Sequence, residues 1–297
     1  MEIVGAYACS HAGLIISHEA KADPGQRDRI YAGFDTIRRE IEALAPDAIY
    51  ILATDHGRIY PLTMLPPFVI GVSPSAHGIG DAGLPECDVP LHQGFARAIL
   101  AGAFERGVDL VYSEEMKIDH SFVCPLTLIT PRFDVPIVPM VQNCSRPPLP
   151  TMGRSHEVGT KLGDAIRAGG EGRIVVIGTG GLSHWVGSPA RQAFLRRPPG
   201  DRYGHEQEFP VEIGERGEIN DDFDRMLVDR LSQGDAPGFL SEWTSDKVID
   251  VAGNGAQEIR NWLTIAGVVA DRPLELIAYE AIPEWHTGTA VARFRLN

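Results

Sequence analysis

The chain has 297 residues and a formal net charge of −13, from 27 basic and 40 acidic side chains. This acidic balance argues against nucleic acid or an anionic membrane as a partner. With 43% hydrophobic and 23% charged residues, the composition is that of a globular protein with ample core. No apolar run approaches the roughly 18 residues that a membrane span needs, and the amino terminus lacks a signal-peptide pattern. We therefore expect a cytoplasmic protein.

The predicted elements alternate between strands and helices along the whole chain. In the first half they are, in order, a strand at 2–9, a helix at 27–44, a strand at 48–53, an ordered excursion rich in Pro and Gly at 62–90, a helix at 91–106 and a strand at 108–112. In the second half they are a strand at 135–141, a helix at 151–168, a strand at 174–177, a polar loop at 188–218, helices at 220–233 and 254–271, and strands at 274–279 and 287–296.

Two details qualify this pattern. The prolines inside 135–141 predict an edge strand or a bulge, because proline cannot donate to a sheet ladder. The four cysteines are scattered without a CxxC pair, which predicts reduced thiols and neither a disulfide framework nor a zinc knuckle. With no internal repeat or linker, one α/β domain over residues 1–297 is the simplest organisation.

Three histidines follow three of the predicted core strands. His11 comes after the strand at 2–9, His56 after the strand at 48–53, and His184 after the strand at 174–177. In open α/β sheets, ligand sites form beyond the carboxyl ends of the strands, so the fold can bring these side chains together. The glycine-rich turn Gly178–Gly181 also has a simpler interpretation, as a structural or phosphate-cradling turn with an incidental histidine.

A carboxylate that completes such a site is found on the helix predicted at 254–271. Helical spacing places Glu258 on the apolar side with Trp262 and Ile265, so its carboxylate is expected to be buried. A buried carboxylate must be paired, protonated or bound to metal. A salt bridge to an arginine is the alternative to metal ligation. Asn254 is expected to cap this helix, with Gln257 returning the contact.

Other signals are weaker or missing. The sequence has no HExxH, GxSxG or Walker motif, and the glycine run lacks the spacing of a dinucleotide fingerprint, so NAD is not expected. Five further histidines lie in polar or loop contexts and are expected to be solvated at the surface: His18, His77, His92, His156 and His205.

Taken together, the motifs resemble the class III extradiol ring-cleavage dioxygenases, with closer similarity to the 2,3-dihydroxyphenylpropionate 1,2-dioxygenases among them. The resemblance extends in order from about residue 9 to residue 295. The matching motifs are Ser10-His11, Asp55-His56-Gly57, Pro66-Pro67-Phe68, Ile79-Gly80-Asp81-Ala82-Gly83-Leu84-Pro85, Asp119-His120-Ser121-Phe122, Gly178–His184, Ala256–Trp262 and Pro283-Glu284-Trp285.

The resemblance implies a single domain with a central mixed sheet flanked by helices, and Fe(II) held by His11, His56 and Glu258. His184 and His120 match the acid/base histidines of the family. We assign His184 as the base and His120 as the acid, and the reverse assignment stays open. The implied reaction is cleavage of a substituted catechol by O2 beside its hydroxyl groups, with both oxygen atoms entering the product, as in the degradation of aromatic compounds.

Four further residues are expected to contact substrate or to support the site: Asp119, Ser183, Trp185 and His286. Asp119 is also expected to orient its neighbour His120. The family's habits favour a homo-oligomer. Two alternatives remain open, a Zn²⁺ hydrolase that uses the same site and a non-catalytic metal-binding member of the superfamily.

Overall fold

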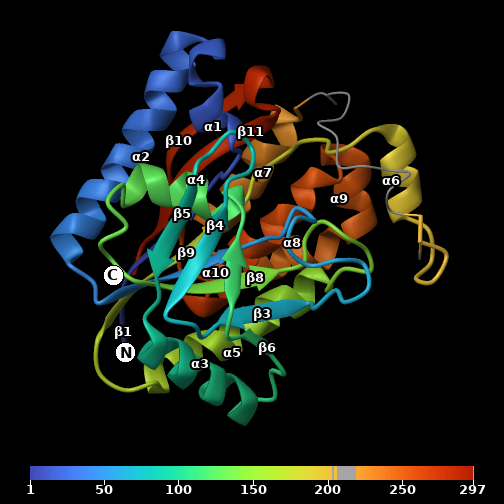
Figure 1. Ribbon diagram of the computed structural model, residues 1–297. Coiled ribbons are helices and arrows are strands. Elements are labelled where there is room, and N and C mark those ends of the chain that lie inside the picture. The colour runs from blue at the N-terminus through green and yellow to red at the C-terminus, as the bar shows by residue number, and fades with distance from the viewer. Residues whose placement is uncertain (203, 206–218, 297) are drawn as a thin grey trace.

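A mixed eight-stranded sheet runs through the computed structural model, which describes residues 1–202, 204–205 and 219–296 (Figure 1). The strands lie side by side in the order β10-β11-β1-β9-β2-β8-β3-β6. Their bounds are β1 (Glu2–Cys9), β2 (Ala48–Ala53), β3 (Phe68–Gly71), β6 (Val111–Ser113), β8 (Ile137–Gln142), β9 (Arg173–Thr179), β10 (Leu274–Ile282) and β11 (Thr287–Phe294). A smaller sheet, in the order β5-β4-β7, is formed by β4 (Ser75–Ile79), β5 (Glu86–Pro90) and β7 (Met116–Ile118).

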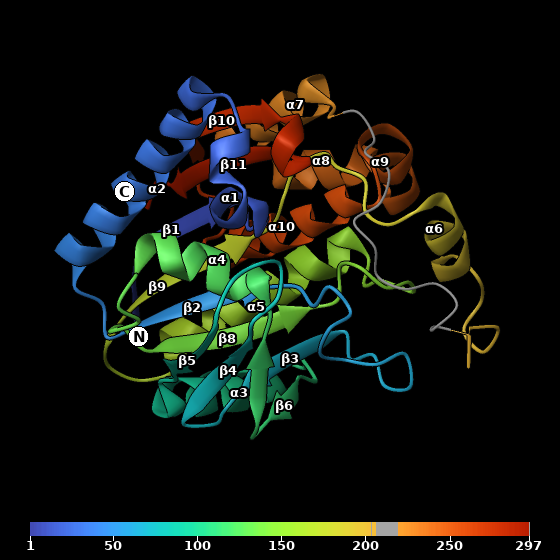
Figure 2. The same cartoon turned by 45° about the horizontal axis from the view of Figure 1, so that its top comes forward.

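Helices cover both faces of the large sheet, as the turned view shows (Figure 2). The helices on one face are α2 (Pro24–Leu44) and α4 (His120–Ile129), with the short α1 (Leu14–Ser17) near β11. The opposite face carries α3 (Gln93–Glu105), α5 (Met152–Ala168), α7 (Asp221–Ser232), α8 (Ala236–Glu242), α9 (Ser245–Ala252) and α10 (Ile259–Val268). Each face has its own buried apolar cluster, exemplified by Phe34 of α2 and by Trp262 of α10. The predicted α/β domain with a central mixed sheet flanked by helices is confirmed.

Parallel pairing gathers the strand ends that matter for function. β1 and β2 both pair in parallel with β9, and β2 also pairs in parallel with β8. Cys9 lies opposite Thr179, and Leu52 lies opposite Gly178, so the three strands end at the same edge. The segments that follow β1, β2 and β9 therefore meet beyond that edge, as the strand topology predicts.

The structure corrects one expectation about a strand and resolves the ordered excursion into shorter elements. β8 is not an edge strand, because it lies between β2 and β3. Pro139 is accommodated because the antiparallel register with β3 extends only to Met140, so the missing N–H interrupts no pairing there. The excursion at 62–90 contains the short strands β3, β4 and β5.

The expected polar loop at 188–218 begins instead with the helix α6 (Pro189–Leu195), which Ser188 caps. The part of that loop at 203 and 206–218 lies outside the described residues. The four cysteines are free thiols. None of the helices in the described part of the chain has both the length and the apolar character required to cross a bilayer.

Candidate metal centre and active site

Three side chains from separate parts of the chain converge beyond the strand ends. Nε2 of His11 lies 3.1 Å from Oε2 of Glu258, and Nε2 of His56 lies 3.0 Å from Oε1 of the same carboxylate. The potential ligand atoms of the three residues all lie within 4.8 Å of one another. His11 and Glu258 are only 2% and 3% exposed. The geometry therefore matches the expected set of two imidazoles and one carboxylate.

Hydrogen bonds on the far side of His11 fix its tautomer. The Thr179 hydroxyl donates to the carbonyl oxygen of Ser121 at 3.0 Å, so its oxygen is left to accept a hydrogen bond. Nδ1 of His11 lies 2.9 Å from that oxygen and must carry the proton. Nε2 consequently presents a lone pair to the site, and it is buried without a hydrogen-bond partner. Burial also lowers the pKa of His11, although Glu258 opposes this shift.

His56 is oriented by a carboxylate. Oδ2 of Asp119 accepts hydrogen bonds from both the backbone N–H of His56, at 2.9 Å, and its Nδ1, at 3.0 Å. Burial disfavours a charged ring, but Asp119 and Glu258 together raise the pKa of His56 well above its ordinary value. Burial would likewise raise the pKa of Asp119, yet the adjacent His56 and His120 hold it far below its usual range. A carboxylate behind a ligating histidine is a common arrangement in metal sites.

Glu258 is ionised and pairs with no arginine among the described residues. Burial would raise its pKa, but the His11 and His56 rings hold it well below the usual range. Its Oε2 also accepts a hydrogen bond from the backbone N–H of Gly181 at 2.8 Å. The alternative of a salt bridge to arginine is therefore wrong, and the expected burial of Glu258 is confirmed.

The chain enters α10 differently from the expected capped helix. Residues Gly255–Glu258 form a 3₁₀ turn (η3), and Ile259 begins the α-helix. Asn254 has helical backbone angles and caps nothing, because its side chain is bonded to the backbone N–H and carbonyl of Val186. A side chain at Gly180 would meet the Glu258 backbone at 2.8 Å, so only glycine lets the turn pass this close.

The donor set fits a metal cation. Nδ1 of each ligating histidine is used by an outer partner, so both Nε2 atoms face the Glu258 carboxylate as acceptors when the rings are neutral. Three acceptors then converge and need a shared cation, which is a proton on His56 in the metal-free site, as its raised pKa indicates, or a metal ion that displaces that proton. Two imidazoles and one carboxylate are the ligand set typical of non-haem Fe(II) oxygenases.

A second carboxylate–histidine pair lies beside the first. Nδ1 of His120 is 2.6 Å from Oδ2 of Asp81, and the His120 backbone N–H donates to Oδ1 at 2.8 Å. The His120 ring stacks on His56, with ring centroids 4.1 Å apart. The expectation that Asp119 orients His120 is wrong, because Asp119 is committed to His56 and to the N-terminus of α4. Asp81, at the turn between β4 and β5, takes that place.

His184 lies on the loop that follows β9 and faces the Glu258 carboxylate. Its Nε2 lies 3.9 Å from Oε2 of Glu258. Its Nδ1 lies 2.8 Å from the carbonyl oxygen of Leu182, and a carbonyl only accepts hydrogen bonds, so Nδ1 carries the proton. In the neutral ring, Nε2 then carries a lone pair on the side that faces Glu258.

A cavity of about 430 Å³ opens over these groups. The five residues expected to form the metal and acid/base set all line it: His11, His56, His120, His184 and Glu258. Trp185 and His286 also line it, and so do three arginines, Arg58, Arg146 and Arg191. Asp119 and Ser183, which were also expected to contact substrate, do not line the cavity, and both side chains are fully buried and bonded to other protein groups.

Sequence reasoning missed the residues that hold the histidines from behind. Asp81 lies in a quoted motif, but no spacing rule connects it to His120 across 39 positions. Thr179 ends a strand and gave no separate signal. Asp224 binds Ser183 through both carboxylate oxygens from the helix predicted at 220–233, in which nothing in the sequence marked this residue.

Comparisons with known proteins agree with this geometry. The family described as the catalytic LigB subunit of aromatic ring-opening dioxygenase matches residues 5–292. A 2,3-dihydroxyphenylpropionate/2,3-dihydroxicinnamic acid 1,2-dioxygenase from Rhodococcus sp is 30% identical, over 96% of this chain and 97% of the relative. A similarly named dioxygenase from Pseudomonas putida is 29% identical, over 86% of each chain. An uncharacterized protein from Escherichia coli K12 shares the fold, with a TM-score of 0.57 and 12% identity over 98% of this chain and 99% of its own.

Proposed function

Because the chain belongs to the family of the catalytic LigB subunit of aromatic ring-opening dioxygenases, we propose that it is an Fe(II)-dependent extradiol dioxygenase. Its reaction is the opening of a substituted catechol ring beside the hydroxyl groups, with both atoms of O2 entering the product. The observation that carries the proposal is the convergence of His11, His56 and Glu258 on one point, with two further histidines lining the same cavity.

His11, His56 and Glu258 would hold the iron. When bound, Fe(II) supplies a Lewis acid and an electron-transfer centre at which a catechol and O2 are activated together. The protein's part is to fix the ligands in the required tautomers. Thr179 does this for His11, and Asp119 does it for His56.

His184 acts as the base in this proposal. With its Nδ1 proton bound to the Leu182 carbonyl, the neutral ring offers Nε2 to a catechol hydroxyl placed at the centre of the site. A general base must lie within hydrogen-bond reach of the proton that it accepts, and His184 lines the same cavity as the proposed iron ligands, with its Nε2 3.9 Å from Oε2 of Glu258.

His120 acts as the acid. Its Nδ1 bonds a carboxylate, Asp81, where His184 bonds a neutral carbonyl. The negative charge of Asp81 offsets the positive charge that the ring carries when Nε2 is also protonated, as an aspartate does behind a catalytic histidine. The two different partners are what support this division of roles.

We also propose that the ring substituent of the substrate ends in a carboxylate. Three arginines line the cavity of a protein whose net charge is −13. The relatives from Rhodococcus sp and Pseudomonas putida are named for substrates that carry an acid group. Arg58 is exposed at the cavity mouth, where its guanidinium can meet such a group without displacing the buried ligands.

Oxygen uptake with a panel of catechols tests the proposal. Protein reconstituted with Fe(II) without air should, on addition of air, consume one O2 per catechol and give a yellow product. Zn²⁺-loaded protein should bind the metal and remain inactive. Zinc at full occupancy in protein purified without oxygen, with no activation by added Fe(II), favours the hydrolase alternative. Binding of iron and catechol without turnover, across the whole panel, favours the non-catalytic alternative.

A further inference from the structure

A buried aspartate behind the active site has no role in the chemistry described above. Asp224, in the first turn of α7, is fully buried. Its Oδ1 accepts a hydrogen bond from the backbone N–H of Ser183 at 2.7 Å. Its Oδ2 accepts two, from the Ser183 hydroxyl at 2.8 Å and from the Tyr279 hydroxyl at 2.9 Å. All three donors are neutral.

The residue that Asp224 holds lies between the two ends of a functional hydrogen bond. Ser183 separates Leu182, whose carbonyl accepts from Nδ1 of His184, from His184 itself. The same loop is bonded to β11 through Leu182 N–H to the Gly288 carbonyl, at 3.1 Å, and Gly288 N–H to the Ser183 carbonyl, at 3.0 Å. A side chain at Gly288 would lie 1.9 Å from Oδ2 of Asp224, so the carboxylate fills the space against the strand.

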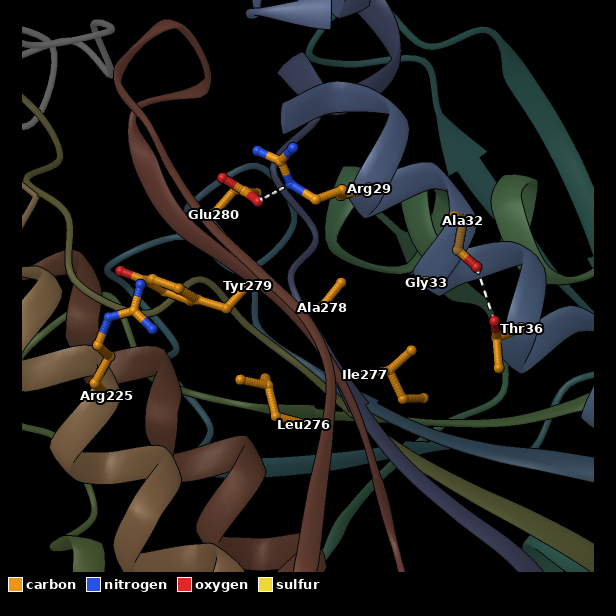
Figure 3. Close-up of a pocket in the computed structure, with 10 residues that line it drawn as sticks. All are labelled: Arg29, Ala32, Gly33, Thr36, Arg225, Leu276, Ile277, Ala278, Tyr279 and Glu280. Atoms are coloured by element: carbon orange, nitrogen blue, oxygen red, sulfur yellow. Dashed lines mark hydrogen bonds and ion pairs between the residues drawn. The ribbon is translucent and has the colours of Figure 1, made fainter. Parts of the chain in front are cut away.

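Tyr279 connects this cluster to the outer surface. Figure 3 shows Tyr279 on β10 beside Arg225 of α7. Both residues line a surface cavity of about 460 Å³, which is also lined by the ion pair of Arg29 with Glu280. The Arg225 guanidinium lies 5.0 Å from the centre of the Tyr279 ring and forms an ion pair with Asp221. With Asp222 on the same turn of α7 and His184 beyond Ser183, these are charged or titratable side chains around Asp224 in the described part of the chain. None of them forms an ion pair with it.

We propose that Asp224 is a positioning residue for His184, and that it holds the histidine loop in the working geometry only while its carboxylate is ionised. The proposal rests on the proposed function for the role of His184. An ionised carboxylate accepts from Ser183 N–H, Ser183 O–H and Tyr279 O–H together. A protonated one must donate its own hydrogen, so one hydroxyl must turn away and the clamp on Ser183 loosens.

The electrostatics place this change near neutral pH. Burial raises the pKa of Asp224 to about 7, against the lowering effect of the bonds from Ser183 and Tyr279. As the pH falls through this value, the carboxylate takes up a proton. The fraction of protein molecules with His184 in the working geometry should therefore decrease below neutral pH and reach its maximum above it. The position of the His184 ring then depends on the ionisation of Asp224, a residue that does not contact the substrate.

The Asp224→Asn variant separates this role from simple folding. Its kcat should fall about tenfold, because a misplaced catalytic group costs rate while substrate binding persists. KM and iron stoichiometry should not change, and the acid limb of the kcat profile near pH 7 should disappear. Tyr279→Phe should keep the fold and move that limb to higher pH, since the carboxylate loses one stabilising donor. Asp222→Asn, an exposed charge on the same turn, is the matched control and should behave as wild type.

A second readout does not require turnover. In the metal-free protein, the amide resonances of Ser183 and His184 should titrate together with a midpoint near pH 7, and this transition should be absent in Asp224→Asn. If they do so in a protein that cleaves no catechol, the positioning role stands and the proposed function fails. The positioning role is overturned if wild type and Asp224→Asn give the same titration, or if Asp224→Asn retains wild-type kcat and the same acid limb.

Discussion

The two sides of the cavity are built in different ways. The floor, defined here as His11, His56 and Glu258, follows directly from strand ends and a 3₁₀ turn, and each of its side chains is bonded on its outer side. The rim, defined as Arg58, Trp185 and His286, comes from loops and is exposed or half-buried. Loops carry variable functions on rigid scaffolds. Under the proposed function, we therefore expect the floor to carry out the reaction and the rim to select the substrate.

Removing the charge of the floor should have the largest effect. Glu258→Gln keeps the size of the side chain, but it places a neutral amide between two imidazole acceptors. Iron binding should be lost and oxygen uptake should fall to background, as measured by metal analysis and an oxygen electrode. Glu171→Gln, an exposed glutamate in a loop, is the control. Full iron occupancy in Glu258→Gln would show that the floor is not the metal site.

The two carboxylate–histidine pairs allow a finer division within the site. Asp119→Asn removes the partner that fixes the tautomer of a ligand, so iron affinity should fall about 10- to 100-fold. Asp81→Asn leaves the ligands untouched, so iron affinity should be unchanged while kcat falls about tenfold or more, as expected for a weakened general acid. Iron titration followed by steady-state kinetics at saturating iron separates the two variants. Equal losses of iron affinity would contradict the separate roles of the two pairs.

The same contrast explains how far the sequence could predict the site. The histidines of the floor could be predicted because parallel strands end at a common edge of the sheet. This topology alone makes His11, His56 and the loop of His184 neighbours. Glu258 could be predicted because helical periodicity places it among apolar residues, even though the turn that carries it proved to be 3₁₀.

The residues behind the floor could not be predicted from the sequence in this way. Asp81 reaches His120 from the turn of a separate small sheet, and Asp224 reaches Ser183 from a helix 41 positions later. No periodicity encodes such contacts, because they depend on how complete elements pack in three dimensions. Local rules failed in a related way at Asn254, whose good capping chemistry is used by the backbone of Val186 instead.

The smallest expected effect lies on the rim, and it should depend on the substrate. Arg58→Gln removes a charge at the cavity mouth but leaves the floor intact. For a catechol with a carboxylate-bearing substituent, kcat/KM should fall about tenfold through KM, in line with the loss of one charge-assisted hydrogen bond near solvent. Unsubstituted catechol should be cleaved as by wild type, and Arg97→Gln, an exposed arginine of α3, should change neither value. An equal loss of kcat/KM with both substrates would show that Arg58 contributes to the reaction itself. The assignment of Arg58 to substrate selection would then be wrong.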